Sequence, residues 1–198
     1  MADPRPIRTR RLLLDAGGQL IAERGVAGLK LADITGRAGV ALGSFQNHFA
    51  SKDELVEAVI VEAVQTLAAQ IVEGPAADDN DPAAAPIVAL RRFVRLAYED
   101  PAFCRLLVNL SRSEEIFVFA IRPYAHAALE RAVSAGALHI ADVDLAVTFT
   151  VAGALAVIRR ILDGHLDSDA DVTLAYAVLL SFGVDPDEAE RLSSAPLR

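Results

Sequence analysis

The chain of 198 residues has little of what several common protein chemistries require. It contains one cysteine, Cys104, so it can form neither an internal disulfide nor a cysteine metal cluster, which suits a reducing compartment. Its apolar runs, such as residues 152–158, stop at charged pairs far below the ~20 residues of a bilayer span. The N-terminus is basic but lacks the apolar region of a secretion signal. We therefore expect a cytoplasmic protein with no membrane segment.

Motifs for enzymatic chemistry are missing as well. The four histidines, His48, His126, His139 and His165, are scattered along the chain, and neither His nor Cys has the spacing of a metal site. There is no glycine-rich phosphate loop, and the sequence nominates no partner for Cys104. We therefore expect a protein that is not an enzyme and that holds no metal and no cofactor.

Charge is distributed unevenly along the chain. The net charge of −8 by itself argues against nucleic acid as a partner. Residues 1–52, however, carry eight basic and four acidic side chains, so this part is +4 and the remainder is −12. A basic segment can neutralise phosphates while an acidic body stays away from DNA, so the asymmetry indicates two functional parts. Only two of the 19 basic residues are lysine, a composition typical of a GC-rich bacterium.

A helix-turn-helix pattern occupies residues 29–49. Ile34 and Ala38 lie one helical turn apart, and Gly39 follows where a chain leaving a helix needs a left-handed residue. Phe45 and Phe49, four residues apart, give the next short helix its buried face. The residues that point elsewhere are mostly short and polar: Leu42, Ser44, Gln46, Asn47 and His48. Such a turn is typical of DNA readers, although an ordinary helical hairpin with a solvated polar face is the alternative.

The flanking residues favour the DNA reader, because with them the stretch resembles the N-terminal domain of the TetR family of transcriptional repressors. The matching residues are Leu14-Asp15-Ala16, Ala22-Glu23-Arg24-Gly25, Asp33-Ile34, Arg37-Ala38-Gly39-Val40, Gly43-Ser44, His48-Phe49 and Ser51-Lys52. The resemblance implies a ligand-responsive repressor, a homodimer that binds a palindromic operator in double-stranded DNA and is released by a small hydrophobic or amphipathic effector. It also implies a DNA-binding domain over residues 1–50 and a ligand-binding and dimerisation domain over 51–198.

Helical periodicity continues to the C-terminus, with no strand-like alternation of useful length. We expect an all-α protein of about nine or ten helices, in which an N-terminal three-helix bundle precedes a larger regulatory domain. Ser51 and Glu54 form a capping-box pattern before a long helix that ends at Gly74-Pro75. Residues 76–86 have the composition of a loop. The other helices are expected near residues 7–24, 87–99, 102–112, 114–136, 143–164, 170–182 and 186–193.

The pattern and the resemblance together nominate DNA-contacting residues. Side chains of the second helix suit base edges, and basic residues beside it suit phosphates. The nominated residues are Arg8, Lys30, Arg37, Leu42, Gly43, Ser44, Gln46, Asn47, His48 and Lys52. This chain has Ala41-Leu42-Gly43-Ser44 where the family usually has Ser-Lys-Gly-Thr, and Gln46 replaces the common Tyr. These departures leave two alternatives open: a helical dimeric interaction module, or a constitutive DNA-binding protein with no inducer.

Residues for the regulatory domain are nominated by resemblance. In the family the ligand cavity lies among the middle helices, one of which Pro123 would kink. The residues nominated there are Phe103, Asn109, Phe117, Tyr124, His126 and Phe149. The last two long helices carry small residues that let helices approach closely, and by resemblance they form a four-helix interface between two copies. The residues nominated for it are Ala146, Gly153, Ala154, Ala175 and Leu179.

Overall fold

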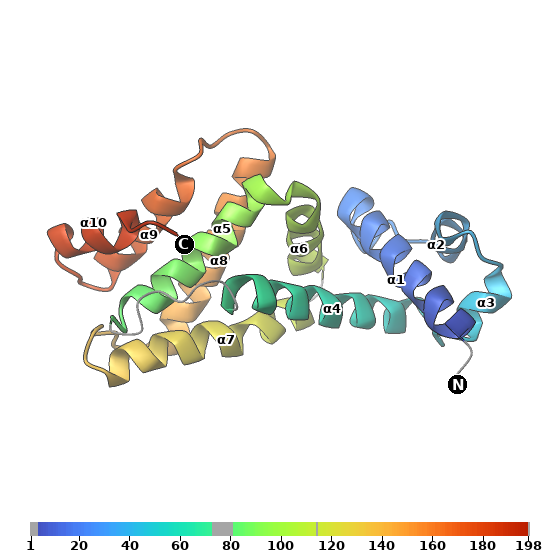
Figure 1. The fold of residues 1–198 in the computed structure, drawn as a ribbon, viewed down its shortest axis with the longest axis horizontal. Helices are drawn as coiled ribbons and strands as arrows, with labels where there is room; N and C mark the ends of the chain where they lie inside the picture. The colour runs from blue at the N-terminus through green and yellow to red at the C-terminus, as the bar shows by residue number, and fades with distance from the viewer. Residues whose placement is uncertain (1–3, 73–80, 114, 198) are drawn as a thin grey trace.

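The computed structural model describes residues 4–72, 81–113 and 115–197, and these residues form ten α-helices with no β-strand (Figure 1). The helices are α1 (Pro4–Arg24), α2 (Leu31–Ala38), α3 (Leu42–Gln46), α4 (Lys52–Val72), α5 (Ala84–Glu99), α6 (Pro101–Ser113), α7 (Glu115–Ser134), α8 (Val143–Leu162), α9 (Ala170–Ser181) and α10 (Pro186–Ser194). The expectation of an all-α fold is confirmed. Pro86, which was expected in a loop, lies in the first turn of α5, where a missing N–H leaves no helical hydrogen bond unmade.

The helices form a small head and a larger body (Figure 1). The head consists of α1, α2 and α3 at one end of the molecule, and the body consists of α5 to α10. Helix α4 begins beside the head and runs into the body, where it packs against α5 and α7. It is therefore the chain's direct connection between the two parts.

The turn between α2 and α3 has the predicted geometry. Gly39 has φ 65° and ψ 33°, a left-handed conformation that costs glycine little, and it ends α2. Ile34 is fully buried, while Phe45 and Phe49 are each 1% exposed with ring centroids 5.6 Å apart. These apolar side chains hold α3 against the head and leave its other face uncovered.

The start of α4 carries the predicted cap in a slightly shifted form. The backbone N–H of Glu54 donates to Oγ of Ser51 at 3.1 Å, as in a capping box. The carboxylate of Glu54 accepts from the N–H of Ala50, one residue before the expected Ser51. This cap fixes the first turn of α4, and with it the position of Lys52 beside the head.

Several contacts tie α1 to the rest of the molecule, among them an ion pair between Arg11 and Glu62 of α4. A Cβ atom at Gly17 would lie 2.6 Å from Cδ2 of Leu55, so glycine is what allows α1 to approach α4 this closely. On the other side of the body, Nδ2 of Asn109 in α6 donates to the carbonyl oxygens of Ile21 at 2.9 Å and Ala22 at 3.0 Å. The carbonyl of Ile21 also accepts from the N–H of Gly25 at 2.8 Å, so Asn109 adds bonds from the body to the C-terminal end of α1.

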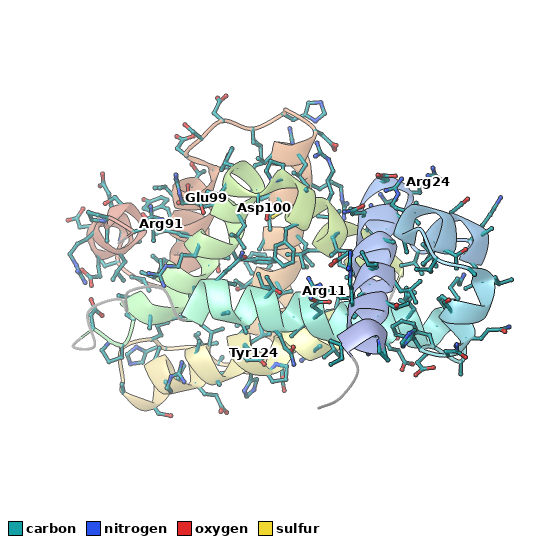
Figure 2. All side chains as sticks on the ribbon, turned by 45° about the vertical axis from the view of Figure 1, so that its right-hand side comes forward. Arg11, Arg24, Arg91, Glu99, Asp100 and Tyr124 are labelled. Carbon is teal, nitrogen blue, oxygen red and sulfur yellow. The ribbon has the colours of Figure 1, made fainter. Side chains whose placement is uncertain are left out.

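The body contains a buried ion pair. Nε of Arg91 lies 2.9 Å from Oδ2 of Asp171, and the two side chains are 7% and 0% exposed. Nη1 of Arg91 also donates to the carbonyl of Ala195, which follows α10. In Figure 2 the Arg91 label lies on the side of the body formed by α9 and α10. The pair therefore joins α5, α9 and the C-terminal segment.

By length and composition alone, helix α8 passes a test for membrane-spanning helices. The sequence analysis did not anticipate this result. Core helices of folded proteins pass the same test. Val147, Ala154 and Ile158 of α8 are fully buried in the protein's own core. This burial accounts for the apolar character of one face of α8, and the opposite face is described below.

Candidate nucleic-acid interface and regulatory body

The exposed surface of α3 gathers most of the residues that were nominated for base contact. Gly43, Gln46 and Asn47 are exposed, and Leu42 has 53% of its surface exposed at the start of the helix. Ser44 and His48 are half-buried beside them. We call Leu42, Gly43, Gln46 and Asn47 the reading face. It contains no charged side chain, so any attraction to phosphates must come from neighbouring elements.

The nominated basic residues Arg8, Lys30 and Lys52 lie on three other elements. Arg8 lies exposed in the first turns of α1, Lys30 is the exposed N-cap of α2, and Lys52 lies in the first turn of α4. The guanidinium of Arg10 lies 5.1 Å from the centroid of the Phe49 ring, which holds it next to the C-terminal end of α3. The sequence analysis did not nominate Arg10, because its partner ring, Phe49, lies far along the chain in the segment between α3 and α4.

The side chain of Arg37, which the sequence analysis nominated for DNA contact, is paired with a carboxylate of α1. Its Nη1 and Nη2 donate to the two carboxylate oxygens of Glu23 at 2.5 and 2.9 Å, so its fork is occupied by α1. These hydrogen bonds hold the pKa of the Glu23 carboxyl below its ordinary value. A second pair, Arg24 with Asp33 at 3.3 Å, links the same two helices. Arg37 therefore holds α2 to α1 in the described structure, and its nomination as a phosphate contact stays a prediction.

The residues nominated for the ligand do not converge on one place. Tyr124 of α7 and Phe149 of α8 are 52% and 53% exposed, and Figure 2 shows Tyr124 at the α7 surface. The amide of Asn109 is bonded to α1, as described above. Phe103 packs partly buried against the core. The side chain of Phe117 lies outside the part of the structure that is described.

His126, the remaining nominated residue, belongs to a charged surface cluster. Its Nδ1 lies 3.5 Å from the carboxylate of Glu130, and its Nε2 lies 3.7 Å from that of Asp144. Asp144 also accepts from Nη2 of Arg122 at 3.0 Å. This cluster joins α7 to the start of α8 on the outside of the body, so its contacts are those of a structural clamp.

Besides the Arg91–Asp171 pair, the body contains a buried hydroxyl and a buried thiol. The hydroxyl oxygen of Thr150 in α8 is buried and makes no hydrogen bond within the described residues. An orphan hydroxyl of this kind needs a water or a ligand as partner. Cys104 of α6 is fully buried, and burial raises the pKa of its thiol to about 12. The thiol is therefore unreactive at neutral pH, and Thr150 is the more informative group.

The outer surface of α8 and α9 is apolar. On α8 the exposed apolar residues follow the spacing of a single helical stripe: Leu145, Phe149, Ala152 and Ala156. Ala177 and Leu180 are exposed on α9, which packs beside α8. We call this surface the α8–α9 face. Leu145, Phe149 and Leu180 are 65%, 53% and 39% exposed, which makes the face unusually apolar for a free surface.

The nominated interface residues lie mostly on the other side of these helices. Ala154, Ala175 and Leu179 are fully buried within the chain, and Ala146 is 7% exposed. Gly153 is half-buried, and a Cβ atom there would lie 3.8 Å from Leu174 of α9. Small residues let α8 and α9 pack within one chain, and the assignment of these residues to an interface with a second copy stays a prediction. Apolar residues of α8 that follow one another at alternating steps of three and four residues form one stripe along the helix. This spacing is the sequence pattern that identifies the outward face of α8.

Comparison with protein families gives two matches that together span most of the chain. The profile described as "Bacterial regulatory proteins, tetR family" matches residues 13–59. The profile described as "Tetracyclin repressor-like, C-terminal domain" matches residues 81–195. Among curated proteins, none matches significantly. The first match covers the second half of α1, all of α2 and α3, and the start of α4, and the second covers the body from α5 onward.

Solved structures similar to this chain extend over nearly its whole length. RolR in complex with resorcinol is 28% identical, covers 98% of this chain and 97% of its own, and has a TM-score of 0.74. A gamma-butyrolactone receptor (ArpA-like protein) is 21% identical over 96% of both chains, with a TM-score of 0.66. A TetR-family protein from Vibrio parahaemolyticus is 22% identical, covers 87% of this chain and 97% of its own, and has a TM-score of 0.67. The last two similarities concern the fold alone.

Proposed function

This chain belongs to the TetR family of bacterial regulatory proteins, and from that membership we propose that it is a dimeric repressor released from its operator by a small molecule. The family consists of transcriptional regulators with a helix-turn-helix, so we propose no catalytic role. The observation that supports the proposal is the neutral, exposed reading face on α3, in a head whose other elements carry the basic residues Arg8 and Lys30 and whose neighbour α4 begins at Lys52. Neutral amides can form hydrogen bonds with base edges, and cations can contact the phosphates beside those bases.

Each group at this surface has a distinct proposed task. Gln46 and Asn47 carry amides that make bidentate hydrogen bonds with adenine, and Leu42 offers an apolar contact for a thymine methyl group. Lys30, Lys52 and Arg8 supply the sequence-independent attraction to phosphates. With Arg37 held by Glu23, fewer cations face the DNA than the sequence predicted. We therefore expect a modest salt dependence for a DNA-binding dimer.

Replacing Gln46 by alanine tests the division between base and phosphate contacts. We expect Gln46→Ala to cost about 1 to 3 kcal/mol on the specific operator and little on random DNA. Lys52→Ala is the matched comparison, expected to weaken both kinds of DNA alike and to reduce the salt slope by about one. Fluorescence anisotropy at several salt concentrations measures both. Unchanged operator binding by Gln46→Ala, with relaxed sequence preference in Lys52→Ala, would reverse the two assignments.

The dimer follows from the α8–α9 face. A symmetric dimer through this face places two reading faces on one DNA duplex, where half-sites are roughly 34 to 36 Å apart. Helix α4 begins at Lys52 beside the head and ends in the body, so a ligand that moves α4 changes that spacing. Coupling of this kind is typically worth about 1 to 3 kcal/mol and acts equally in both directions. The division of the chain near residue 50 is part of this proposal.

The ligand is proposed to contact the hydroxyl of Thr150. This group is buried in the body and lacks a hydrogen-bond partner among the described residues. RolR, which is 28% identical over nearly the whole chain, has been solved with resorcinol, a small aromatic molecule with two hydroxyl groups. A ligand of that kind would give Thr150 the partner it lacks. We therefore propose a small, mainly apolar effector that carries a hydrogen-bonding group.

Replacing Thr150 by valine keeps the shape of the side chain and removes its hydroxyl. We expect the ligand-free protein to gain stability, by about 1 kcal/mol, because a buried polar group without a partner is lost. We expect the same variant to weaken resorcinol binding, or that of any effector later identified. Thermal melting and calorimetry measure the two effects. Thr148→Val is the control, since the exposed Thr148 hydroxyl already donates to the carbonyl of Asp144 at 2.9 Å.

The function as a whole is tested by selecting operator fragments from random DNA and titrating effector into the free dimer and the operator complex. We expect the effector to bind the complex more weakly than the free protein, by the factor with which it weakens DNA binding. Equal affinities in the two titrations would favour a constitutive DNA-binding protein. Failure to select any sequence would favour a helical interaction module.

A further inference from the structure

We propose that helix α3 reads a stretch of A·T base pairs alone in each half-site, with the α3 backbone at Gly43 lying directly against the DNA. This base preference rests on the DNA-binding function proposed above, and it defines the class of operator that the reading face binds. Three features of the head indicate it: the side chains on the reading face, those missing from it, and a glycine that the chain's own packing does not require. Figure 1 shows α3 at the outer end of the head, away from the body.

The side chains on the reading face match A·T pairs. Gln46 and Asn47 are exposed and carry amides, the group that pairs with the N6 and N7 edge of adenine. Leu42 is exposed at the start of α3, a large apolar side chain in a polar surface. Such a side chain gains by covering the methyl group of thymine, which only an A·T pair presents in the major groove.

Side chains that read G·C pairs are missing from the same stretch. Guanine is read best by arginine or lysine, and the amino group of cytosine by aspartate or glutamate. Residues 42–48 include none of these four types. Ser44 suits either kind of pair, and the half-buried His48 carries neither a guanidinium nor an ammonium group. A G·C pair facing α3 would therefore meet no side chain matched to it.

Arginines elsewhere in the head are engaged with other groups. Three of them pair with carboxylates of the chain: Arg11, Arg24 and Arg37. The guanidinium of Arg10 lies over the ring of Phe49. Arg8 and Lys30 lie on α1 and at the N-cap of α2, and their proposed partners are phosphates. The bases that face α3 are therefore left to its neutral side chains.

Gly43 indicates how closely the DNA approaches. A Cβ atom added at Gly43 would meet nothing within 4 Å, and its φ lies outside the left-handed region, so neither packing nor backbone geometry requires glycine there. Glycine within a helix is destabilising relative to alanine. Gly17 is the contrast, because Leu55 fills the space that its Cβ atom would take. Close approach of a ligand to the backbone accounts for a glycine that the chain itself does not need, and on the reading face that ligand is DNA.

The base preference is tested by selecting operators from random duplex DNA with the full chain, and again with Leu42→Ala, Gln46→Ala and Asn47→Ala. The positions whose preference changes in a variant are those that α3 reads. We expect each to be an A·T pair, and its replacement by G·C to weaken wild-type binding at least about fivefold. Replacing thymine by uracil removes the methyl group alone. At the position read by Leu42 it should weaken wild-type binding about fourfold and leave Leu42→Ala binding unchanged.

A G·C pair at a position read by α3, equal binding of thymine and uracil duplexes at every position, or preferences that none of the three variants alters would each overturn the A·T reading. In all three outcomes the protein still binds an operator, so the function proposed above survives. If no sequence is selected, that function fails and the base preference fails with it.

Gly43→Ala tests the close approach of the backbone. We expect its Tm to be no lower than that of the wild type, because alanine favours the helix and has room. Operator binding should weaken at least about tenfold, because the added methyl group keeps α3 away from the base edges. Gly36→Ala is the matched control: Gly36 is exposed and equally open but lies on α2, so operator binding should be unchanged. Wild-type operator binding by Gly43→Ala, a lower Tm, or an equal loss of binding in Gly36→Ala would contradict the close approach.

Discussion

Phe149→Glu is expected to convert the protein from a dimer into a monomer of 21.0 kDa. Phe149 is the largest side chain in the exposed stripe of α8, with Leu145 one turn before it and Ala152 one turn after it. Aromatic residues at the centre of an interface are commonly worth 2 kcal/mol or more, and a glutamate would also bring an unpaired charge into an apolar contact. We expect the dimer dissociation constant to rise at least about a hundredfold, measured by sedimentation at micromolar concentrations.

The same substitution should remove operator binding, because a single reading face cannot engage both half-sites. Val61→Glu is the matched control, since Val61 is 56% exposed on α4 and lies off the α8–α9 face. It should stay dimeric and bind operator normally. A dimeric Phe149→Glu variant would show that the two copies meet elsewhere, and the α8–α9 face would then need a different partner.

Asp171→Ala is expected to destabilise the body severely. The substitution leaves the guanidinium of Arg91 buried without its carboxylate, and breaking one side of a buried pair costs about 3 to 5 kcal/mol. For a chain of this size that corresponds to a decrease in Tm of roughly 6 to 20 °C. Far-UV circular dichroism during heating measures it. Arg95 lies 3.4 Å from Asp171 and would lose part of its anchorage as well.

Asp169→Ala provides the control for that measurement. Asp169 lies two residues earlier, is exposed, and makes no side-chain cap bond although it is the N-cap of α9. Its replacement should change Tm little. A double variant, Arg91→Met with Asp171→Leu, should recover much of the loss, because apolar pairs of similar volume commonly replace buried ion pairs. If Asp171→Ala melted like Asp169→Ala, the ion pair would contribute nothing to the fold.

Local features of the fold were readable from the sequence because their causes are local. Gly39 ends α2 in the left-handed conformation, and Ser51 caps α4. In both cases the interacting groups lie within a few residues of one another in the sequence. The buried pair Phe45 and Phe49 followed from one helical turn in the same way. Turn chemistry and periodicity carry this information without any knowledge of tertiary contacts.

Contacts between distant segments were not readable in this way. Arg37 was assigned to DNA, but its partner Glu23 lies on another helix, fourteen residues away. The Arg91–Asp171 pair spans eighty residues, and no pattern in the sequence joins them. On α8 and α9 the burial of the nominated residues has a different explanation. Ala154 was chosen because it is small, whereas the direction in which a residue points depends on its position in the helical stripe.

The bond from Asn109 to α1 bears on how regulators of this architecture diversify. Its acceptors are the backbone carbonyls of Ile21 and Ala22, which any amino acid would supply. The bond therefore sets no demand on side chains in the head, and operator preference can drift by substitution there while the head stays attached. A chimera that joins this body to the α1–α3 segment of another regulator should keep the bond, provided the foreign α1 ends at the same residue. Exchange of heads between such proteins then depends, at this contact, on helix length rather than on matched side chains, whereas the contact with α4 still requires a small residue at the position of Gly17.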